Sequence, residues 1–424
     1  MSNYSHRGYE HRTGTYGRRR KKASGFRSKN KTGKAAQITA LVTVVIFAFV
    51  LLYLFADNIS PFVHSIKSVE RPPVVSEPTK STTADTPESS NNNIIDKDNV
   101  NTQDIPLKKA EGYFDYVNKK IFISNGSGYT IFKGIDVTAK NYAAVLNSIS
   151  SSVPSKVKLC AAVIPTKTDV SLDGVIEGSH SQSENINIIK NSLSDNVNFI
   201  NIIDMLIDYN DEYLYYRTDG ALTAMGGYYV YNAVAPELGV DVKSIYTLSE
   251  LSKKKGSISP FYGEYSASTT DKINQPNGNI ELYKNSDTVE YYKLPVHYNC
   301  YKRSLDGSYS LEYDLFKEIN ISDDPLEIFP SYKTPLLYIE NTQKNNDNKL
   351  LVVKDHAAEP LIGYLVPHFK EVHCVDVSLL GESVTSYINK NEITHILIIN
   401  GIEDANNSLY CQRLRDLFDN SISN

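Results

Sequence analysis

Two residues in this chain have the side chains that acid–base chemistry requires. Asp219 lies in the tyrosine-rich stretch 215–223, just ahead of a helix-like segment that begins near Ala224. His356 follows the apolar run 349–353 and is preceded by Lys354 and Asp355. An imidazole that is oriented by a carboxylate can act as a base that activates a hydroxyl group or a water molecule. This pair is therefore the starting point for any catalytic hypothesis.

Three interpretations of His356 are consistent with its position. It is a hydrogen-bonded histidine on the rim of an inactive pocket, or a relocated base that reaches toward Asp219. Alternatively, it binds a divalent metal together with Asp219 and Asp355, because imidazole and carboxylate groups suit several such ions. We prefer the first interpretation, and we predict no metal and no cofactor.

Asp219 also has purely structural interpretations. It is a candidate N-cap for the helix that starts near Thr223, or an ion-pair partner of Arg217. Hydroxyl groups are supplied by Thr218, Thr223 and Ser408, but none of them has a base at a recognisable spacing.

The elements that would position these residues alternate between apolar strands and amphipathic helices. Strands are predicted at 157–164, 197–202, 349–353, 372–377 and 394–400, and helices around 142–149, 186–193, 357–366, 382–390 and 404–418. Nearly continuous apolar strands separated by helices indicate a parallel sheet covered on both faces. Such sheets carry their sites at the carboxyl ends of the strands, which places the residues after Ile164, Val353 and Ile399 on the functional edge. Residues 240–345 are rich in Tyr, Ser, Gly and Asn and predict an irregular, β-containing insertion.

The N-terminal part of the chain predicts a membrane anchor. Residues 1–34 contain eleven Lys or Arg and one acidic residue, and residues 35–56 contain no charge and are largely apolar. Twenty-two such residues span about 30 Å of hydrocarbon as one helix. Because the basic flank precedes the apolar segment, we expect a cytoplasmic, disordered tail and an extracytoplasmic C-terminal part in the cell membrane.

A low-complexity linker and an acidic domain follow the predicted span. Residues 57–108 are rich in Pro, Ser, Thr and Asn and have few aromatic residues, so they form an extracytoplasmic linker. The whole chain has 44 basic and 49 acidic residues, and removal of the basic tail leaves a net charge of −15. We therefore expect no nucleic-acid binding. The four cysteines form no CxxC pair, which leaves a zinc ribbon unsupported. Outside the cytoplasm they could form disulfides, but Cys160 and Cys374 lie in predicted core strands, where buried free thiols are equally consistent with the sequence.

Several segments, in this order, resemble the DHHW family. They are 162–167 (AVIPTK), 215–229 (YYRTDGALTAMGGYY), 261–266 (FYGEYS), 350–357 (LLVVKDHA) and 366–369 (VPHF). The corresponding family patterns are a strand that ends in Pro-Thr/Ser, YYRTD-H-H-W-T before a Gly-Ala-Tyr helix, F-x-G-T-x-Y, L-L-V-I-K-D-S-Y-A, and an apolar-Pro-aromatic continuation. The resemblance covers most of residues 110–410.

The resemblance implies a fold similar to the SGNH-like domains of alginate O-acetyltransferases, which use a Ser-His-Asp arrangement. On this mapping Asp219 keeps the aspartate position. Ala221 stands at the position of the histidine base, Gly220 at the other histidine, and His356 at the nucleophilic serine. Loss of either the nucleophile or the base of such a triad costs orders of magnitude in rate. The resemblance therefore implies a fold that is retained without its reaction.

A binding role is suggested by the aromatic residues. The chain has 30 tyrosines and no tryptophan, and Tyr215, Tyr216, Tyr228 and Tyr229 flank the former site. Tyrosine rings can stack on sugar rings while their hydroxyl groups form hydrogen bonds, although half-buried strands favour tyrosine anyway. Contacts with a ligand are expected from Arg217, Tyr216, Thr218, Lys167, Lys354 and Asp355.

These observations lead to one overall prediction. Residues 109–424 are expected to form an SGNH-like (flavodoxin-like) three-layer α/β sandwich with a mainly parallel sheet and a β-rich insertion at 240–345. We expect a membrane-anchored extracytoplasmic pseudoenzyme that binds a cell-envelope polysaccharide or a partner protein, such as a membrane-bound O-acyltransferase. The alternative is an active but rewired polysaccharide O-acetyltransferase or acetylesterase that uses His356 and Asp219.

Overall fold

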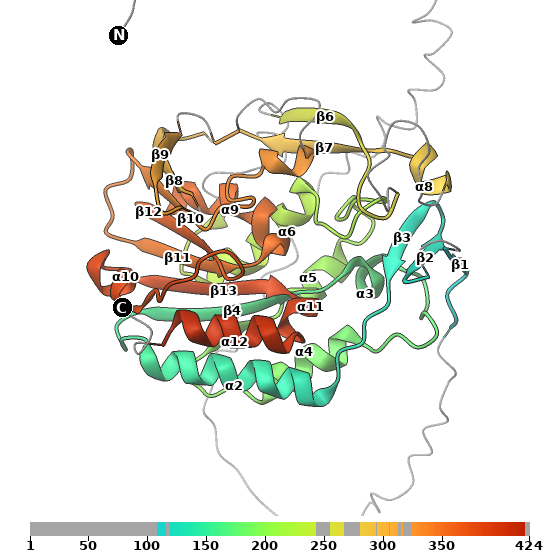
Figure 1. The fold of residues 1–424 in the computed structure, drawn as a ribbon, viewed down its shortest axis with the longest axis horizontal. Coiled ribbons are helices and arrows are strands. Elements are labelled where there is room, and N and C mark those ends of the chain that lie inside the picture. The colour runs from blue at the N-terminus through green and yellow to red at the C-terminus, as the bar shows by residue number, and fades with distance from the viewer. Residues whose placement is uncertain are drawn as a thin grey trace, which may run out of the picture. The chain divides into compact units, whose positions relative to one another are not determined.

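The computed structural model describes most of the chain that follows the predicted linker (Figure 1). The described residues are 108–115, 119–242, 255–266, 280–293, 295–304, 306–312, 315–316 and 324–419. The predicted tail, membrane span and almost all of the linker lie outside them. Within the described ranges, no helix is both long enough and apolar enough to cross a membrane.

An eight-stranded sheet forms the centre of the described part, with the strand order β5-β4-β13-β11-β12-β10-β8-β9. The first five of these strands are parallel, and β10, β8 and β9 continue the sheet in antiparallel fashion. Their bounds are β4 Lys158–Ile164, β5 Asn198–Ile200, β8 Tyr298–Arg303, β9 Tyr309–Glu312, β10 Leu336–Asn341, β11 Lys349–Lys354, β12 Glu371–Asp376 and β13 His395–Gly401. The expected mixed α/β fold with a mostly parallel sheet is confirmed.

Helices cover both faces of this sheet, because alternate strand residues point to opposite faces. Leu159, Ala161 and Val163 of β4 belong to one buried cluster, and Cys160 and Ala162 belong to the other. The first cluster packs against α2 (Asp136–Ser152), α4 (Gln182–Asn191), α10 (Thr385–Lys390) and α12 (Ser408–Leu417). The second packs against α5 (Ile203–Asp208), α6 (Ala224–Glu237) and α9 (Glu359–Leu365).

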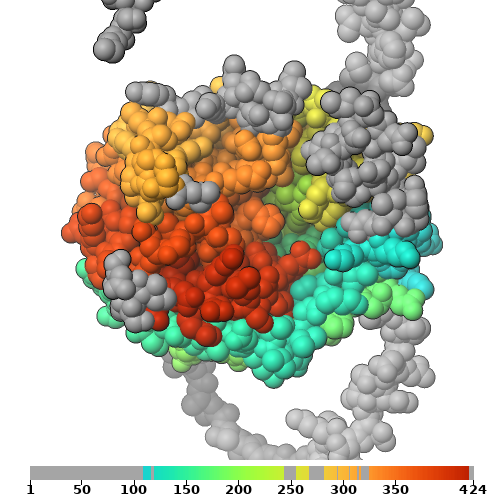
Figure 2. Space-filling view, viewed as in Figure 1, coloured from blue at the N-terminus to red at the C-terminus, as the bar shows by residue number. Residues whose placement is uncertain are grey.

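Segments from the two ends of the described part lie side by side in the first helical layer. Helices α2 and α12 run next to each other below the sheet in Figure 1, and their surfaces adjoin in the space-filling view of the same face (Figure 2). All four cysteines are buried and free, which is the second of the two alternatives left open by the sequence.

The predicted insertion differs from expectation. Among the described elements of this range, β6 (Lys255–Phe261), β7 (Asp287–Tyr292), α8 (Ile280–Lys284) and η2 (Pro325–Ile328) stand apart from the central sheet, and β6 and β7 form a two-stranded sheet. Strands β8, β9 and β10 lie in the same range but extend the main sheet. Their alternating polar and apolar residues suit an antiparallel half that is less deeply buried than the parallel strands.

Two further local features were not predicted. A small antiparallel sheet precedes the first helix and is formed by β1 (Tyr113–Phe114), β2 (Ile121–Ser124) and β3 (Ser127–Thr130). The expected helix 404–418 is split into α11 (Ile402–Ala405) and α12, because Asn407 caps a new helix by accepting hydrogen bonds from Leu409 N at 3.0 Å and Tyr410 N at 3.4 Å. Short helices complete the chain: α3 (Lys167–Ser171), η2 (Pro325–Ile328), η3 (His356–Ala358) and η4 (Val366–His368).

Candidate functional site

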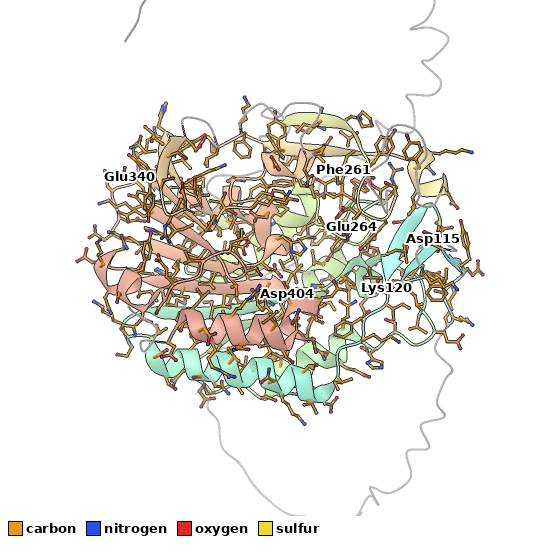
Figure 3. The ribbon with its side chains drawn as sticks, in the orientation of Figure 1. Asp115, Lys120, Phe261, Glu264, Glu340 and Asp404 are labelled. Atoms are coloured by element: carbon orange, nitrogen blue, oxygen red, sulfur yellow. The ribbon has the colours of Figure 1, made fainter. Side chains whose placement is uncertain are left out.

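A cavity of about 620 Å³ lies beyond the carboxyl ends of β4, β11 and β13. Its wall includes Pro165 after β4, His356 after β11 and Asp404 after β13, in agreement with the edge predicted to be functional. Figure 3 shows Glu264 and Asp404 at this same end of the sheet. Cavities of this size commonly hold small ligands or a short stretch of a polymer.

Asp219 lies in the cavity wall, but both of its oxygen atoms are already engaged by the backbone. Oδ1 accepts a hydrogen bond from Ala221 N at 2.9 Å, and Oδ2 accepts one from Glu264 N at 2.9 Å. Burial raises the pKa of Asp219, while these two hydrogen bonds oppose the rise. The carboxylate thus joins the 219–221 turn to the loop that follows β6.

The two structural roles proposed for Asp219 from the sequence belong to other residues. Thr223 itself caps α6, since its hydroxyl accepts a hydrogen bond from Gly226 N at 3.1 Å. Arg217 forms its ion pair with Asp287, with 3.0 Å between Nε and Oδ1. Both interpretations of Asp219 were therefore wrong in this respect.

Asp287 was missed by the sequence analysis and organises the turn before the cavity. Its Oδ2 accepts hydrogen bonds from the backbone nitrogen and the hydroxyl of Thr218, at 2.8 and 2.5 Å. Its Oδ1 accepts from Arg217 and from the Tyr213 hydroxyl. Thr218 Oγ1 in turn accepts from Gly263 N at 2.9 Å. Burial would raise the pKa of Asp287, but this set of donors outweighs it and holds the pKa below its usual value.

Lys167 supports the same turn from the opposite side. Its buried Nζ donates to the carbonyl oxygens of Tyr216, Arg217 and Asp219 at 2.6, 3.1 and 3.0 Å. Burial lowers the pKa of this amine to about 7, although Asp219 acts in the opposite direction. Because Lys167 is only 3 % exposed and lies behind the cavity wall, its placement gives it a positioning role.

His356 lies beside two carboxylates, and Asp219 is not one of them. Ligand atoms of Asp355, His356 and Asp404 all lie within 4.8 Å of one another. Desolvation favours the neutral imidazole, but Asp355 and Asp404 outweigh it and raise the pKa of His356. No hydrogen bond or ion pair joins His356 to Asp219, although both are described and both line the cavity. The alternative in which His356 pairs with Asp219 is thus not what the structure shows, since Asp355 and Asp404 are the carboxylates beside His356.

Asp355 is buried and fixed in place by the backbone. Its Oδ1 accepts a hydrogen bond from Ala357 N at 2.8 Å, and its Oδ2 accepts one from Gly401 N at 2.7 Å. The second bond links the end of β11 to the end of β13. Burial raises the pKa of Asp355, while His356 opposes this rise and the neighbouring Asp404 adds to it.

Lys354 lies behind the wall in a fully buried ion-pair group. Its Nζ contacts Glu359 and lies 3.6 Å from Asp376 Oδ2, and Glu359 also accepts a hydrogen bond from the Ser331 hydroxyl. Lys354 is 0 % exposed. Like Lys167, it is placed to support the cavity rather than to contact a ligand.

The cavity wall is strongly acidic. Among the residues that the structure describes, no lysine or arginine lines the cavity. The carboxylates in the wall come from loops and helix starts: Asp219, Glu264, Asp324, Asp355, Glu359, Glu403 and Asp404. Burial raises the pKa of Glu264 and of Glu403, and the neighbouring Asp219 and Asp404, respectively, add to the effect. Such a surface disfavours anionic ligands.

Comparison with known proteins identifies the family. The family model described as DHHW protein matches residues 89–375, a range that includes Asp219 and His356. The chain belongs to the DHHW family. Among curated proteins, no match to the sequence was found.

Solved structures confirm the fold of this DHHW protein. A DHHW family protein from Eubacterium siraeum is 23 % identical, covers 70 % of this chain and 94 % of its own, and superposes with a TM-score of 0.60. PatB1 from Bacillus cereus is 17 % identical, with 68 % and 98 % covered and a TM-score of 0.55. The O-acetyltransferase domain of Pseudomonas putida AlgJ also matches, at 10 % identity, 72 % and 99 % coverage and a TM-score of 0.40.

The two positions of the DHHW histidines have different surroundings in this chain. Ala221 lines the cavity and is half-buried. Gly220 has no room for a side chain, because a Cβ atom there would lie 2.4 Å from the Tyr265 hydroxyl. Within the described part of the chain, His356 is the only imidazole that lines the cavity.

The tyrosines that line the cavity are mostly not those expected. Tyr215 reaches the wall, but its hydroxyl is held by the Pro165 carbonyl at 2.7 Å. Tyr216, Tyr228 and Tyr229 do not line the cavity, and Tyr229 stacks on Tyr209 with 4.2 Å between ring centroids.

Tyr262, Tyr265 and Tyr332 line the cavity instead. The FYGEYS segment was the available signal for two of them and for Glu264. The remaining expected contact residues, Arg217 and Thr218, are engaged with Asp287 and do not line the cavity. Of the six residues expected to contact a ligand, only Asp355 lies in its wall.

Proposed function

We propose that this DHHW protein is an extracytoplasmic polysaccharide-binding domain that has lost the acyl transfer of a Ser-His-Asp site. The arrangement around Asp219 is the observation that carries the proposal. Its two oxygen atoms bind backbone N–H groups, the adjacent base position holds Ala221, and the nucleophile position holds His356. A triad needs a carboxylate that orients an imidazole and an imidazole that activates a hydroxyl group, and neither link exists here.

The chemistry of the cavity supports a ligand with many hydroxyl groups. Tyr262 and Tyr332 supply aromatic surface, and the exposed Glu264 and Glu403 supply hydrogen-bond acceptors. Sugar hydroxyl groups donate to carboxylates, and sugar faces pack on aromatic rings. The acidic wall favours neutral or basic glycans over acidic ones.

Purified full-length protein should not hydrolyse a small acetyl ester above the background rate. Ala221 cannot accept a proton, and His356 offers no hydroxyl group that could be acylated. Release of acetate or of a chromogenic alcohol measures this directly.

The same preparation should bind neutral envelope polysaccharide. Tyr262→Ala should weaken this binding, because Tyr262 lines the cavity. Tyr209→Ala is the control and should leave the binding unchanged, because Tyr209 stacks on Tyr229 outside the cavity.

The converse variant combines Ala221→His with His356→Ser. If the frame around Asp219 remains suited to the family reaction, weak esterase activity should appear in the double variant only. Each single variant serves as the matched control, because it restores the base without the nucleophile or the nucleophile without the base. Esterase activity in the unchanged protein would contradict the proposal.

A rewired esterase is the second candidate function. The observation that favours it is the approach of Asp355 and Asp404 to His356, which gives the imidazole a carboxylate neighbour. In this case the unchanged protein hydrolyses the ester with water as nucleophile, and both His356→Ala and Asp404→Asn abolish turnover with the fold intact.

We further propose that the domain is attached to the cell membrane by residues 35–56, with the basic tail in the cytoplasm. The basic flank and the uncharged segment support this topology. External protease added to intact cells should release a fragment from the domain side of residue 57 and spare residues 1–34. Protection of the domain in intact cells, with cleavage only after lysis, would refute this topology.

We propose a membrane-bound O-acyltransferase as the protein partner, because a domain anchored in this way would lie in the same membrane and could bind it.

A further inference from the structure

The group formed by Asp355, His356 and Asp404 has the composition of a metal site. It contains one imidazole and two carboxylates, and their ligand atoms lie within 4.8 Å of one another. The residues follow two adjacent parallel strands, β11 and β13, which pair through Lys354 and Ile399. The topology therefore brings the three side chains together at the end of the sheet that holds the cavity.

The geometry requires little adjustment to hold an ion. Ligand atoms at 2.0–2.2 Å from a metal lie at most roughly 4 Å apart. His356 is exposed and Asp404 half-buried, so both can move by the fraction of an ångström that this requires. Asp355 is held rigidly by Ala357 N and Gly401 N, in the way that outer hydrogen bonds orient metal ligands.

A separate observation points to a cation at this place. Asp355 is buried and Asp404 half-buried, and an oxygen atom of each lies within the 4.8 Å that encloses the three-residue group. Among the described residues no lysine or arginine lines the cavity, and the buried Lys354 is engaged by Glu359 and Asp376. A divalent metal ion at this place would neutralise the negative charge of both carboxylates.

We propose that Asp355, His356 and Asp404 bind one divalent first-row metal ion, such as Mn²⁺ or Zn²⁺, in the cavity wall. An imidazole together with carboxylates suits these ions better than Mg²⁺ or Ca²⁺, which prefer oxygen ligands only. Three protein ligands leave coordination positions that face the cavity for water or for a hydroxyl group of a ligand. The proposal holds whether or not the cavity binds a polysaccharide.

The test uses the full-length protein, stripped of metal with a chelator and titrated with MnCl₂. Electron paramagnetic resonance of free Mn²⁺ gives the number of bound ions and their affinity, and thermal unfolding gives an independent readout. We expect one ion per chain and a rise in the unfolding temperature. Asp404→Asn and His356→Ala should each weaken binding by more than about tenfold, since each removes a ligand. Neither Mg²⁺ nor Ca²⁺ should compete effectively at equal concentration.

Asp324→Asn is the matched control, because Asp324 lines the same cavity and is absent from the three-residue group. Its affinity for Mn²⁺ should stay within about twofold of the unchanged protein, since a partly exposed charge that is not a ligand contributes little. An equal loss in Asp324→Asn would show a diffuse electrostatic effect and overturn the proposal. Unchanged binding in Asp404→Asn and His356→Ala, or no binding at millimolar Mn²⁺, would overturn it as well.

Discussion

Replacement of Lys354 by methionine should lower the free energy of unfolding by about 3–5 kcal/mol, the cost of leaving a buried charge without its partner. Lys354 is 0 % exposed and is the cation beside both Glu359 and Asp376. Burial alone would lower the pKa of this amine, but the two carboxylates outweigh it and keep the pKa above its ordinary value. Urea denaturation of the full-length protein measures the change.

The double variant Lys354→Met, Glu359→Gln distinguishes a lost ion pair from poor packing of methionine. Because it removes both charges of the closest pair, it should recover part of the stability lost in the single variant. Lys255→Met is the control for an exposed pair, since Lys255 and Glu290 are both more than two-fifths exposed, and it should cost less than about 1 kcal/mol. If Lys354→Met were as mild as Lys255→Met, the buried pair would not stabilise the fold.

The parallel half of the fold was predictable because its signal is local. The apolar runs at 349–353, 372–377 and 394–400 became β11, β12 and β13 within one or two residues, since strands buried on both faces need apolar side chains throughout. The split between α11 and α12 was not predictable in the same way. Asn406 at the break bonds to Asn185 and Thr138, which are more than two hundred residues away in the chain.

The position of the candidate site was predictable from the sequence, but the contacts between its side chains were not. The strand ends placed His356 and Asp355 on the functional edge, and the same argument pointed to the residues after Ile399, where Asp404 lies. Which carboxylate approaches His356 depends on the register of β11 against β13, and the sequence does not state this register. Glu264 and Asp287 were not predicted as site residues, because their contacts with the 217–219 turn join positions that are 45 or more residues apart in the sequence.

Replacement of Asp287 by alanine should lower the free energy of unfolding by about 3–5 kcal/mol and loosen the turn that carries Asp219. The change removes the hydrogen-bond acceptor of four donor groups: the Thr218 hydroxyl and backbone nitrogen, the Tyr213 hydroxyl and the Arg217 guanidinium. Because Thr218 also holds Gly263, the loop after β6 loses an attachment. Amide hydrogen exchange should therefore accelerate at Ala221 and Glu264, whose N–H groups bind Asp219. Glu290→Ala, on the same strand but at an exposed pair, should leave both amides protected.

The pH dependence of stability provides an independent test of Asp287. The folded state holds the pKa of this carboxyl below its ordinary value of 3.8, so its contribution is fully present above that pH. As the pH falls further, through the depressed folded-state pKa, the carboxylate takes up a proton and the contribution is lost. The stability difference between the unchanged protein and Asp287→Asn should thus be constant near neutral pH and shrink below about pH 4. A difference that stays constant down to pH 2 would mean that the charge of Asp287 contributes nothing, and that only the shape of its hydrogen bonds matters.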